Sequence, residues 1–253
     1  MKITVLGCGS SLGVPALKYG WGQCDPKNEK NRRTRSSIKI DTSTTSLLVD
    51  TSPDLLWQLQ KCENRRVDAV FYTHAHYDHT SGINELRPMF LGQNKKLQIY
   101  STEENINQIK KMFFYLFENS DVEIYKSYME LYSIKSNFSI GDINVRCFEQ
   151  NHGFSTSLGL RIGNFAYTTD IHILTENVIA ELTGVDTWIL DCTSFERESL
   201  THINLPTALK WIDIIKPRRA FFTHMDSTMD YDTLCEFLPS NIAPAYDQMQ
   251  IEV

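Results

Sequence analysis

Residues 69–79 read Ala-Val-Phe-Tyr-Thr-His-Ala-His-Tyr-Asp-His and hold three of the chain's seven histidines. The apolar run at their start, Ala69–Tyr72, predicts a buried strand. Side chains at positions i and i+2 of a strand end point to one side, so His74 and His76 can reach the same cation. A turn after them would let Asp78 and His79 face a second cation. Imidazoles with a carboxylate suit zinc or another borderline divalent metal better than calcium or magnesium.

Short apolar, β-rich runs alternate with helical patterns on both sides of this stretch. The runs that predict strands are Lys2–Leu6, Ser36–Ile40, Leu47–Asp50, Ala69–Tyr72, Leu97–Tyr100, Ile143–Phe148, Leu158–Ile162, Asn164–Thr168, Thr187–Asp191 and Arg219–Phe222. The patterns that predict helices are Pro53–Cys62, Thr102–Phe117, Thr175–Leu182, Leu205–Ile215 and Tyr231–Leu238. Strands near both ends with helices between them predict a layered α/β sandwich rather than a single parallel sheet. We expect one domain over residues 1–253.

Three more polar residues follow apolar runs at predicted strand ends: His152, Asp170 and His224. Strand ends are where α/β proteins present functional groups. Taken singly, each is more often a turn or cap residue. Together with the histidines of residues 69–79, they form a set of candidate ligands.

The order of this set resembles the metallo-β-lactamase superfamily: a strand followed by HxHxDH, a distant His, an Asp after Tyr167-Thr168-Thr169, and a final Thr-His. The resemblance covers the whole chain. It implies a four-layer αββα sandwich with the site at the sheet edges. Carried over position by position, it implies one metal held by His74, His76 and His152, a second held by Asp78, His79 and His224, and Asp170 bridging the two.

The resemblance therefore implies two divalent metal ions as cofactors. Zinc is the default for these ligands, and manganese or iron is also accepted by such a site. A water between the two cations has a lowered pKa and gives a hydroxide nucleophile at neutral pH. Asp78, as a ligand of the second cation, is then part of the catalytic group.

The glycine-containing stretch Leu6–Pro15 has the spacing GxGxxxG after the first strand. No helical pattern follows, which argues against a dinucleotide-binding loop. The stretch resembles the superfamily branch that hydrolyses phosphodiesters, which contains tRNase Z and the phosphoribosyl cyclic phosphodiesterases. Backbone amides of such a loop can approach a phosphate, and Ser10 is a candidate substrate contact. The alternative is a plain strand-to-loop turn.

His202 lies just before the predicted helix that contains Pro206, where helix amides favour a phosphate. Its surroundings resemble the cyclic phosphodiesterase group, which implies that His202 is a phosphate contact and the general acid for the leaving oxygen. The alternative is a histidine with only a local structural role. His172 is interpreted as a surface residue or as one that contacts a metal ligand from outside. Asp54 and Asp191 are given no catalytic role, and Asp191 is a candidate contact of a metal-ligating histidine.

Residues 16–35 are polar and predict a long loop, a feature that is often functional in a compact domain. Arg32, Arg33 and Arg35 are candidate phosphate contacts, with a solvated loop as the alternative. Members of the phosphodiesterase branch can carry a structural zinc on early cysteines and a late histidine. Here only Cys24 and Ser227 stand at such positions, so we expect no structural zinc.

Composition limits the function classes. The chain has 25 Lys and Arg against 31 Asp and Glu, a net charge of −6, which argues against a protein that grips long nucleic acid. Six scattered cysteines without a CxxC pair indicate reduced, cytoplasmic usage. No stretch approaches a membrane span or a signal peptide. The aromatic stretch Met112–Phe117 predicts a core helix or a self-association face, and a homodimer is compatible with it.

These observations predict a metal-dependent hydrolase of a small phosphodiester, cyclic or nucleotide-like, such as 5-phosphoribosyl 1,2-cyclic phosphate. The nearest alternative is a tRNA 3′-processing endonuclease, which would need an RNA-gripping arm and a basic surface. A thioester or lactam hydrolase is more distant. A non-catalytic, metal-dependent nucleotide-binding module is the alternative from another class, and the complete ligand set argues against it.

Overall fold

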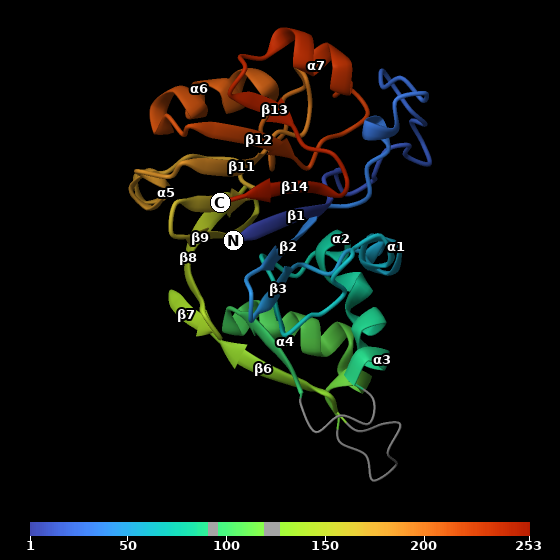
Figure 1. The fold of residues 1–253 in the computed structure, drawn as a ribbon, viewed down its shortest axis with the longest axis vertical. Coiled ribbons are helices and arrows are strands. Elements are labelled where there is room, and N and C mark those ends of the chain that lie inside the picture. Colours follow the sequence, from blue (N-terminus) through green and yellow to red (C-terminus); the bar gives the residue numbers. More distant parts are fainter. Residues whose placement is uncertain (91–95, 119–126) are drawn as a thin grey trace.

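The computed structural model describes residues 1–90, 96–118 and 127–253. Two seven-stranded mixed sheets are stacked, and helices cover the outer face of each, as Figure 1 shows. Helices α1 to α4 lie with the first sheet, and α5 to α7 with the second. The αββα sandwich expected from the sequence is confirmed.

The first sheet is parallel on one side and antiparallel on the other. Strands β3 to β6 run parallel, whereas β14, β1, β2 and β3 pair antiparallel. Its strands, in spatial order, are β14 (Met249–Glu252), β1 (Lys2–Gly7), β2 (Ser37–Asp41), β3 (Ser46–Val49), β4 (Ala69–Phe71), β5 (Leu97–Ser101) and β6 (Met129–Ser133).

The second sheet repeats this mixture of parallel and antiparallel pairs. Strands β10 to β13 run parallel, and β7 to β10 pair antiparallel. Its strands, in spatial order, are β13 (Ile242–Pro244), β12 (Arg219–Thr223), β11 (Thr187–Asp191), β10 (Phe165–Thr168), β9 (Ser155–Ile162), β8 (Ile143–His152) and β7 (Asn137–Ile140).

The helices are short, and none among the described residues is long and apolar enough to cross a membrane. The α-helices are α1 (Leu55–Gln60), α2 (Tyr77–Thr80), α3 (Arg87–Phe90), α4 (Glu103–Met112), α5 (Glu176–Leu182), α6 (Leu205–Ile215) and α7 (Tyr231–Phe237), and the 3-10 turns are η1 (Glu29–Asn31), η2 (Ser81–Leu86) and η3 (Phe114–Leu116). The helix expected over 102–117 ends at Met112, because the next residue, Phe113, leaves the helical region. The aromatic stretch is therefore a 3-10 turn with Phe114 and Tyr115 exposed.

Alternation along the strands divides the core into two layers. In β3, Leu47 and Val49 point between the sheets, whereas Leu48 points to the layer under the helices. Val70 of β4 joins Leu48 there, and Phe71 joins the layer between the sheets. Strands that are buried on both faces read as continuous apolar runs, which is why these central strands were recognisable from sequence.

The strands that the sequence did not predict are β6, β7, β13 and β14, and these are the four edges of the two sheets. Edge strands pair on one side only and tolerate polar or interrupted sequences. β14 reads Met-Gln-Ile-Glu, and β13 is three residues long and ends at Pro244. Neither pattern carries the apolar run by which the inner strands are identified.

Candidate metal centre

The candidate ligands meet because the carboxyl ends of the inner strands lie at one edge of the sandwich. His74 follows β4, Asp170 follows β10 and His224 follows β12. His152 is the last residue of β8, and Asp78 lies in the short helix α2. The donor atoms of the predicted ligands form the groups His74/His76/His152, His74/His79/Asp170 and Asp78/His79/His224, each within 4.8 Å. Both sheets thus contribute to one cluster.

Asp170 lies at the centre of this cluster. One of its carboxylate oxygens is 3.2 Å from Nε2 of His79. The other is 3.6 Å from Nε2 of His152, 3.6 Å from that of His224 and 3.9 Å from that of His74. This position suits a carboxylate shared by two cations, as expected from the sequence.

Asp50, at the end of β3, orients two of the histidines. The Thr73 hydroxyl donates to Asp50 Oδ2 at 2.8 Å, so the same hydroxyl oxygen accepts from His74 Nδ1 at 3.0 Å. His79 Nδ1 donates to Asp50 Oδ2 directly, at 2.7 Å. With Nδ1 protonated in both rings, the lone pairs of both Nε2 atoms point into the cluster. Such outer contacts fix the tautomer that binds metal.

Asp191, at the end of β11, has the corresponding place in the second sheet. The Thr193 hydroxyl donates to Asp191 Oδ1 at 3.0 Å and accepts from His224 Nδ1 at 3.3 Å. Asp191 Oδ2 accepts from His202 Nδ1 at 2.8 Å and from the backbone amide of Asp170 at 2.9 Å. In each sheet, therefore, one aspartate orients one histidine through a threonine hydroxyl and a second histidine directly.

The donor set fits divalent cations. The Nε2 atoms of His74, His79 and His224 are buried and have no hydrogen-bond partner among the described residues. Asp170 oxygens lie 3.2–3.9 Å from these nitrogens without accepting a hydrogen bond from them. Buried polar atoms are almost always hydrogen-bonded, so this convergence indicates a site for cations that bind both kinds of donor. Burial also lowers the pKa of the His74 imidazole well below its usual value, which keeps the ring in the neutral form that binds metal.

Three of these residues have backbone conformations that non-glycine residues rarely adopt. Asp50, Asp170 and His224 have φ angles of 62°, 55° and 59°. Each stands just past a strand end, where the left-handed conformation turns the chain sharply. Such conformations cost on the order of 1–3 kcal/mol each and persist where the surrounding structure enforces them. Their concentration here marks the cluster as the functional part of the fold.

A pocket of about 550 Å³ opens beside the cluster, with His202 and His224 in its wall. Its other lining residues are Ser10, Ser11, Leu12, Gly13, Ala16, Tyr19, Thr193, Arg197, Ser199, Thr201, Asp226, Ser227 and Thr228. Hydroxyl groups dominate this wall. The size is that of a small-molecule site.

His202 lies between the cluster and this pocket. Its ring stacks on that of His224 at 4.5 Å, and its Nε2 is 4.0 Å from the Asp170 carboxylate. Burial opposes the charged ring, but the Asp191 carboxylate outweighs it and raises the pKa of His202 to about 9. The raised pKa favours the protonated ring that a proton donor needs. His172 is half-buried, and its ring contacts the carbonyl of His202 at 3.3 Å.

The loop arginines do not form the phosphate site considered from the sequence. Arg33 is buried: its guanidinium donates to the carbonyl of Met229 at 2.6 Å and to the side chain of Asn31 at 3.2 Å. Assigning Arg33 to the substrate was wrong, because it holds the loop against the segment before α7.

The two neighbouring arginines also have protein partners. Arg35 is ion-paired with Asp54 at 3.0 Å, and Arg32 stacks on the Trp21 ring at 4.9 Å. Neither Arg32 nor Arg35 lines the 550 Å³ pocket. Of the substrate contacts expected from the sequence, Ser10 and His202 do line the pocket, and the Ser10 amide is already bonded to the Met225 carbonyl at 3.0 Å. The absence of a structural zinc stays a prediction.

We expect Arg33→Met to lower the free energy of unfolding by about 2–4 kcal/mol, because it leaves buried acceptors unpaired. Urea unfolding of the variant measures this. Arg32→Met is the matched control and should cost under about 1 kcal/mol, the scale of an exposed cation–π contact. A stable Arg33 variant with a raised KM would instead restore Arg33 as a substrate contact.

Asp50, Thr73 and Thr193 are the site residues that the sequence reasoning missed. Asp50 could have been recognised from the sequence, because it stands at the end of the predicted strand Leu47–Asp50, much as Asp170 follows the predicted strand Asn164–Thr168. The two threonines had none, because their role depends on contacts with carboxylates that the sequence does not place.

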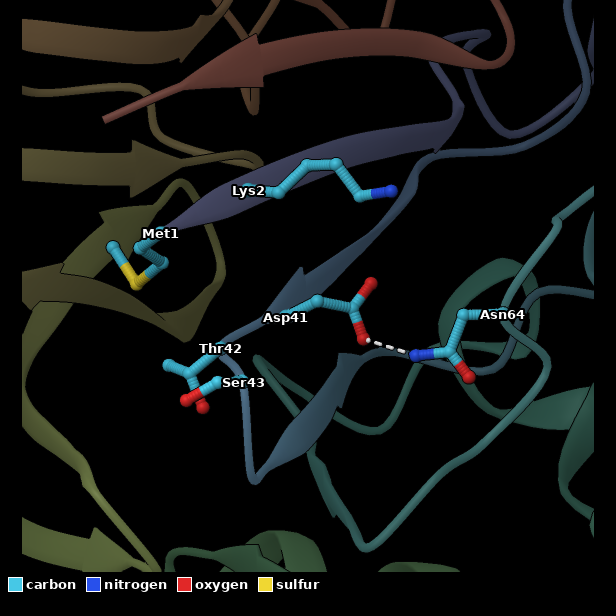
Figure 2. A pocket seen from close by; sticks show the side chains of 6 residues that line it. All are labelled: Met1, Lys2, Asp41, Thr42, Ser43 and Asn64. Carbon is cyan, nitrogen blue, oxygen red and sulfur yellow. Dashed lines mark hydrogen bonds between the residues drawn. The ribbon is translucent and has the colours of Figure 1, made fainter.

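A second hollow, of about 520 Å³, lies beside the start of β1 and the end of β2, at the end of these strands that is far from the metal cluster. Figure 2 shows its lining, in which Asn64 donates to Asp41 at 3.0 Å. The nearby Lys39 is buried and ion-paired with Asp41. The Asp41 carboxylate in this lining is thus paired within the protein, in contrast to the nitrogens of the metal cluster.

Comparison with known proteins agrees with this geometry. Residues 45–225 match the family model described as the β-lactamase superfamily domain. The chain therefore belongs to the metallo-β-lactamase superfamily. The fold and the donor set together imply divalent metal ions.

Several solved structures share the fold over the whole chain. A diphosphatase from the PhnP family is 25% identical, with a TM-score of 0.91 over 100% of this chain and 97% of that chain. Zinc-bound PqqB from Methylobacterium extorquens is 18% identical, with a TM-score of 0.77 over 100% of both chains. The short form of human tRNase Z is 17% identical, with a TM-score of 0.72 over 100% of this chain and 99% of that one.

A curated relative is the octanoyltransferase of Porphyromonas gingivalis (strain ATCC BAA-308 / W83). It is 26% identical over 254 residues, which cover 99% of this chain and 51% of the relative. The chain thus spans about half the length of that protein.

Proposed function

We propose that this protein hydrolyses a small phosphodiester with two divalent cations bound at the His/Asp cluster. The observation that carries the proposal is the convergence of unpaired Nε2 atoms on the Asp170 carboxylate, beside a hydroxyl-lined pocket. His74, His76 and His152 would hold one cation, and Asp78, His79 and His224 the other, with Asp170 between them. Bound cations supply Lewis-acid activation of the phosphoryl group and of water.

His202 is proposed as the proton donor to the leaving oxygen. Asp191 holds its Nδ1 at 2.8 Å, so the ring presents Nε2–H toward the cluster. A positioned acid of this kind contributes about 10²–10⁴-fold to a rate. The hydroxyls of Ser10 and of the other pocket residues can bind the equatorial oxygens or a sugar.

The substrate is proposed to be small. A pocket of about 550 Å³ matches a nucleotide or sugar phosphate, and the net charge of −6 disfavours a long polyanion. The similarity to a diphosphatase of the PhnP family supports P–O bond cleavage and adds a diphosphate link to the candidates. Octanoyl transfer is not proposed, because that name belongs to a protein of about twice the length of this chain.

Phosphorus NMR of the zinc- or manganese-loaded protein tests the proposal. The substrates are 5-phosphoribosyl 1,2-cyclic phosphate, a 2′,3′-cyclic nucleotide and ADP-ribose, whose diphosphate link represents the phosphoanhydride class. We expect opening of the ribosyl ring diester, with the cyclic nucleotide slower. If protein with both metals bound hydrolyses none of the three substrates, the proposal is contradicted. Binding without turnover would instead support a binding module, and a steep salt dependence of RNA binding would support a tRNA-processing role.

A further inference from the structure

The pocket beside the metal cluster needs a cationic group if its substrate carries a second anionic group. Among the residues that line it, the one Lys or Arg is Arg197. Of the three arginines considered from the sequence, Arg33 and Arg35 are engaged by Met229 and Asp54, and Arg32 stacks on Trp21 outside the pocket lining. His202, which also lines the pocket, is proposed to face the leaving oxygen, so among the described residues a direct cationic contact to a second phosphate falls to Arg197.

Arg197 is accessible and weakly held. Its side chain is 61% exposed, and its Nη2 makes an ion pair with Asp226 at 3.0 Å. An exposed pair of this kind is worth at most about 1 kcal/mol, so the guanidinium can turn to a ligand at little cost. Asp226 keeps other partners, because its Oδ1 accepts from the amide and the hydroxyl of Thr228 at 2.8 and 2.6 Å.

The loop that carries Arg197 also carries His202, and hydrogen bonds hold it in place along its length. The Ser194 hydroxyl donates to the carbonyl of Arg197 at 2.6 Å, and the Ser199 hydroxyl accepts from the amide of His202 at 3.3 Å. Asn204, which caps α6, donates to the carbonyl of Glu196 at 3.0 Å. The loop therefore holds the arginine and the proposed proton donor in the same pocket wall.

We propose that Arg197 binds a second phosphate of the substrate, distant from the phosphoryl group that is attacked, and so selects doubly phosphorylated substrates. This inference rests on the proposed function and narrows its substrate class. Arg197 would pair with phosphate oxygens through charge-assisted hydrogen bonds, and the hydroxyls of Ser199 and Thr228 lie in the same wall. It is a specificity residue and takes no part in the bond-breaking step.

The test compares Arg197→Gln with the parent protein on two substrates, 5-phosphoribosyl 1,2-cyclic phosphate and the same ring without the 5-phosphate. We expect the variant to raise KM for the phosphorylated ring by about 10- to 100-fold, with kcat nearly unchanged. The unphosphorylated ring should be turned over equally by both proteins. Arg146→Gln is the matched control, since Arg146 is 55% exposed, forms a 3.3 Å pair with Glu181 and does not line the pocket.

A binding measurement separates this inference from the proposed function. Calorimetry of the metal-loaded protein with ribose 1,5-bisphosphate and ribose 1-phosphate needs no turnover. We expect the bisphosphate to bind more tightly to the parent protein and Arg197→Gln to remove that difference. If the variant keeps the full preference, the assignment of Arg197 is overturned even when diester hydrolysis is found. If the difference is removed but no diester is cleaved, the subsite stands and the reaction class fails.

Discussion

Asp170→Ala is expected to reduce turnover by about 10³-fold or more and to lower the metal content of the purified protein. Asp170 lies within 4 Å of the Nε2 atoms of His74, His79, His152 and His224, so its loss removes the carboxylate shared by both predicted cation sites. The measurements are the rate of diester hydrolysis and the metal-to-protein ratio by plasma mass spectrometry.

Asp213→Asn is the control for this variant, because Asp213 is an exposed carboxylate on α6 that lies in none of the donor groups. It should change neither the rate nor the metal content. Asp170→Ala with two metals per chain and a rate within tenfold of the parent would contradict the assignment of Asp170 as the bridging ligand.

His202→Ala is expected to lower turnover by about 10²–10⁴-fold while both metals stay bound. The reason is that the leaving oxygen then departs without a proton. The loss of turnover should depend on the leaving group. It should be large for a ribosyl or other alkyl oxygen. For a p-nitrophenyl phosphodiester it should be under about tenfold, since nitrophenolate leaves without protonation.

His172→Ala is the matched control for His202→Ala, because its ring contacts the backbone of His202 and lies in none of the donor groups. An equal loss on both leaving groups would mean that His202 binds the phosphoryl group and does not protonate the leaving oxygen. A loss of only a few-fold, in folded and metal-loaded protein, would remove both roles.

The sequence was sufficient to predict which residues come together in the candidate metal centre, because their positions follow the strand ends. His74, His76, Asp78 and His79 all follow one apolar strand, and the strand end brings them together. His152, Asp170 and His224 also follow strands, and the superfamily order identified them. The inner strands were predictable for the same reason, since burial on both faces leaves an apolar run.

What the sequence could not predict depends on contacts between distant segments. Arg33 appeared to belong to an exposed basic loop, and only its contact with Met229, 196 positions away, makes it a buried residue. Arg197 belongs to no sequence motif, and its proposed role depends on the pocket wall that it shares with His202. The edge strands were missed because pairing on one side imposes no strong pattern.

The metal cluster takes its donors from both sheets: His74 and His79 follow a strand of the first, and Asp170 and His224 follow strands of the second. Cations bound there would bind the folded chain and not its separated halves. By mass action, a cation present at 100 times its Kd would add about 2.7 kcal/mol to the free energy of unfolding. Metal supply in the cell would then govern how long the protein survives as well as how fast it works, and apo-protein would be the form that is degraded first.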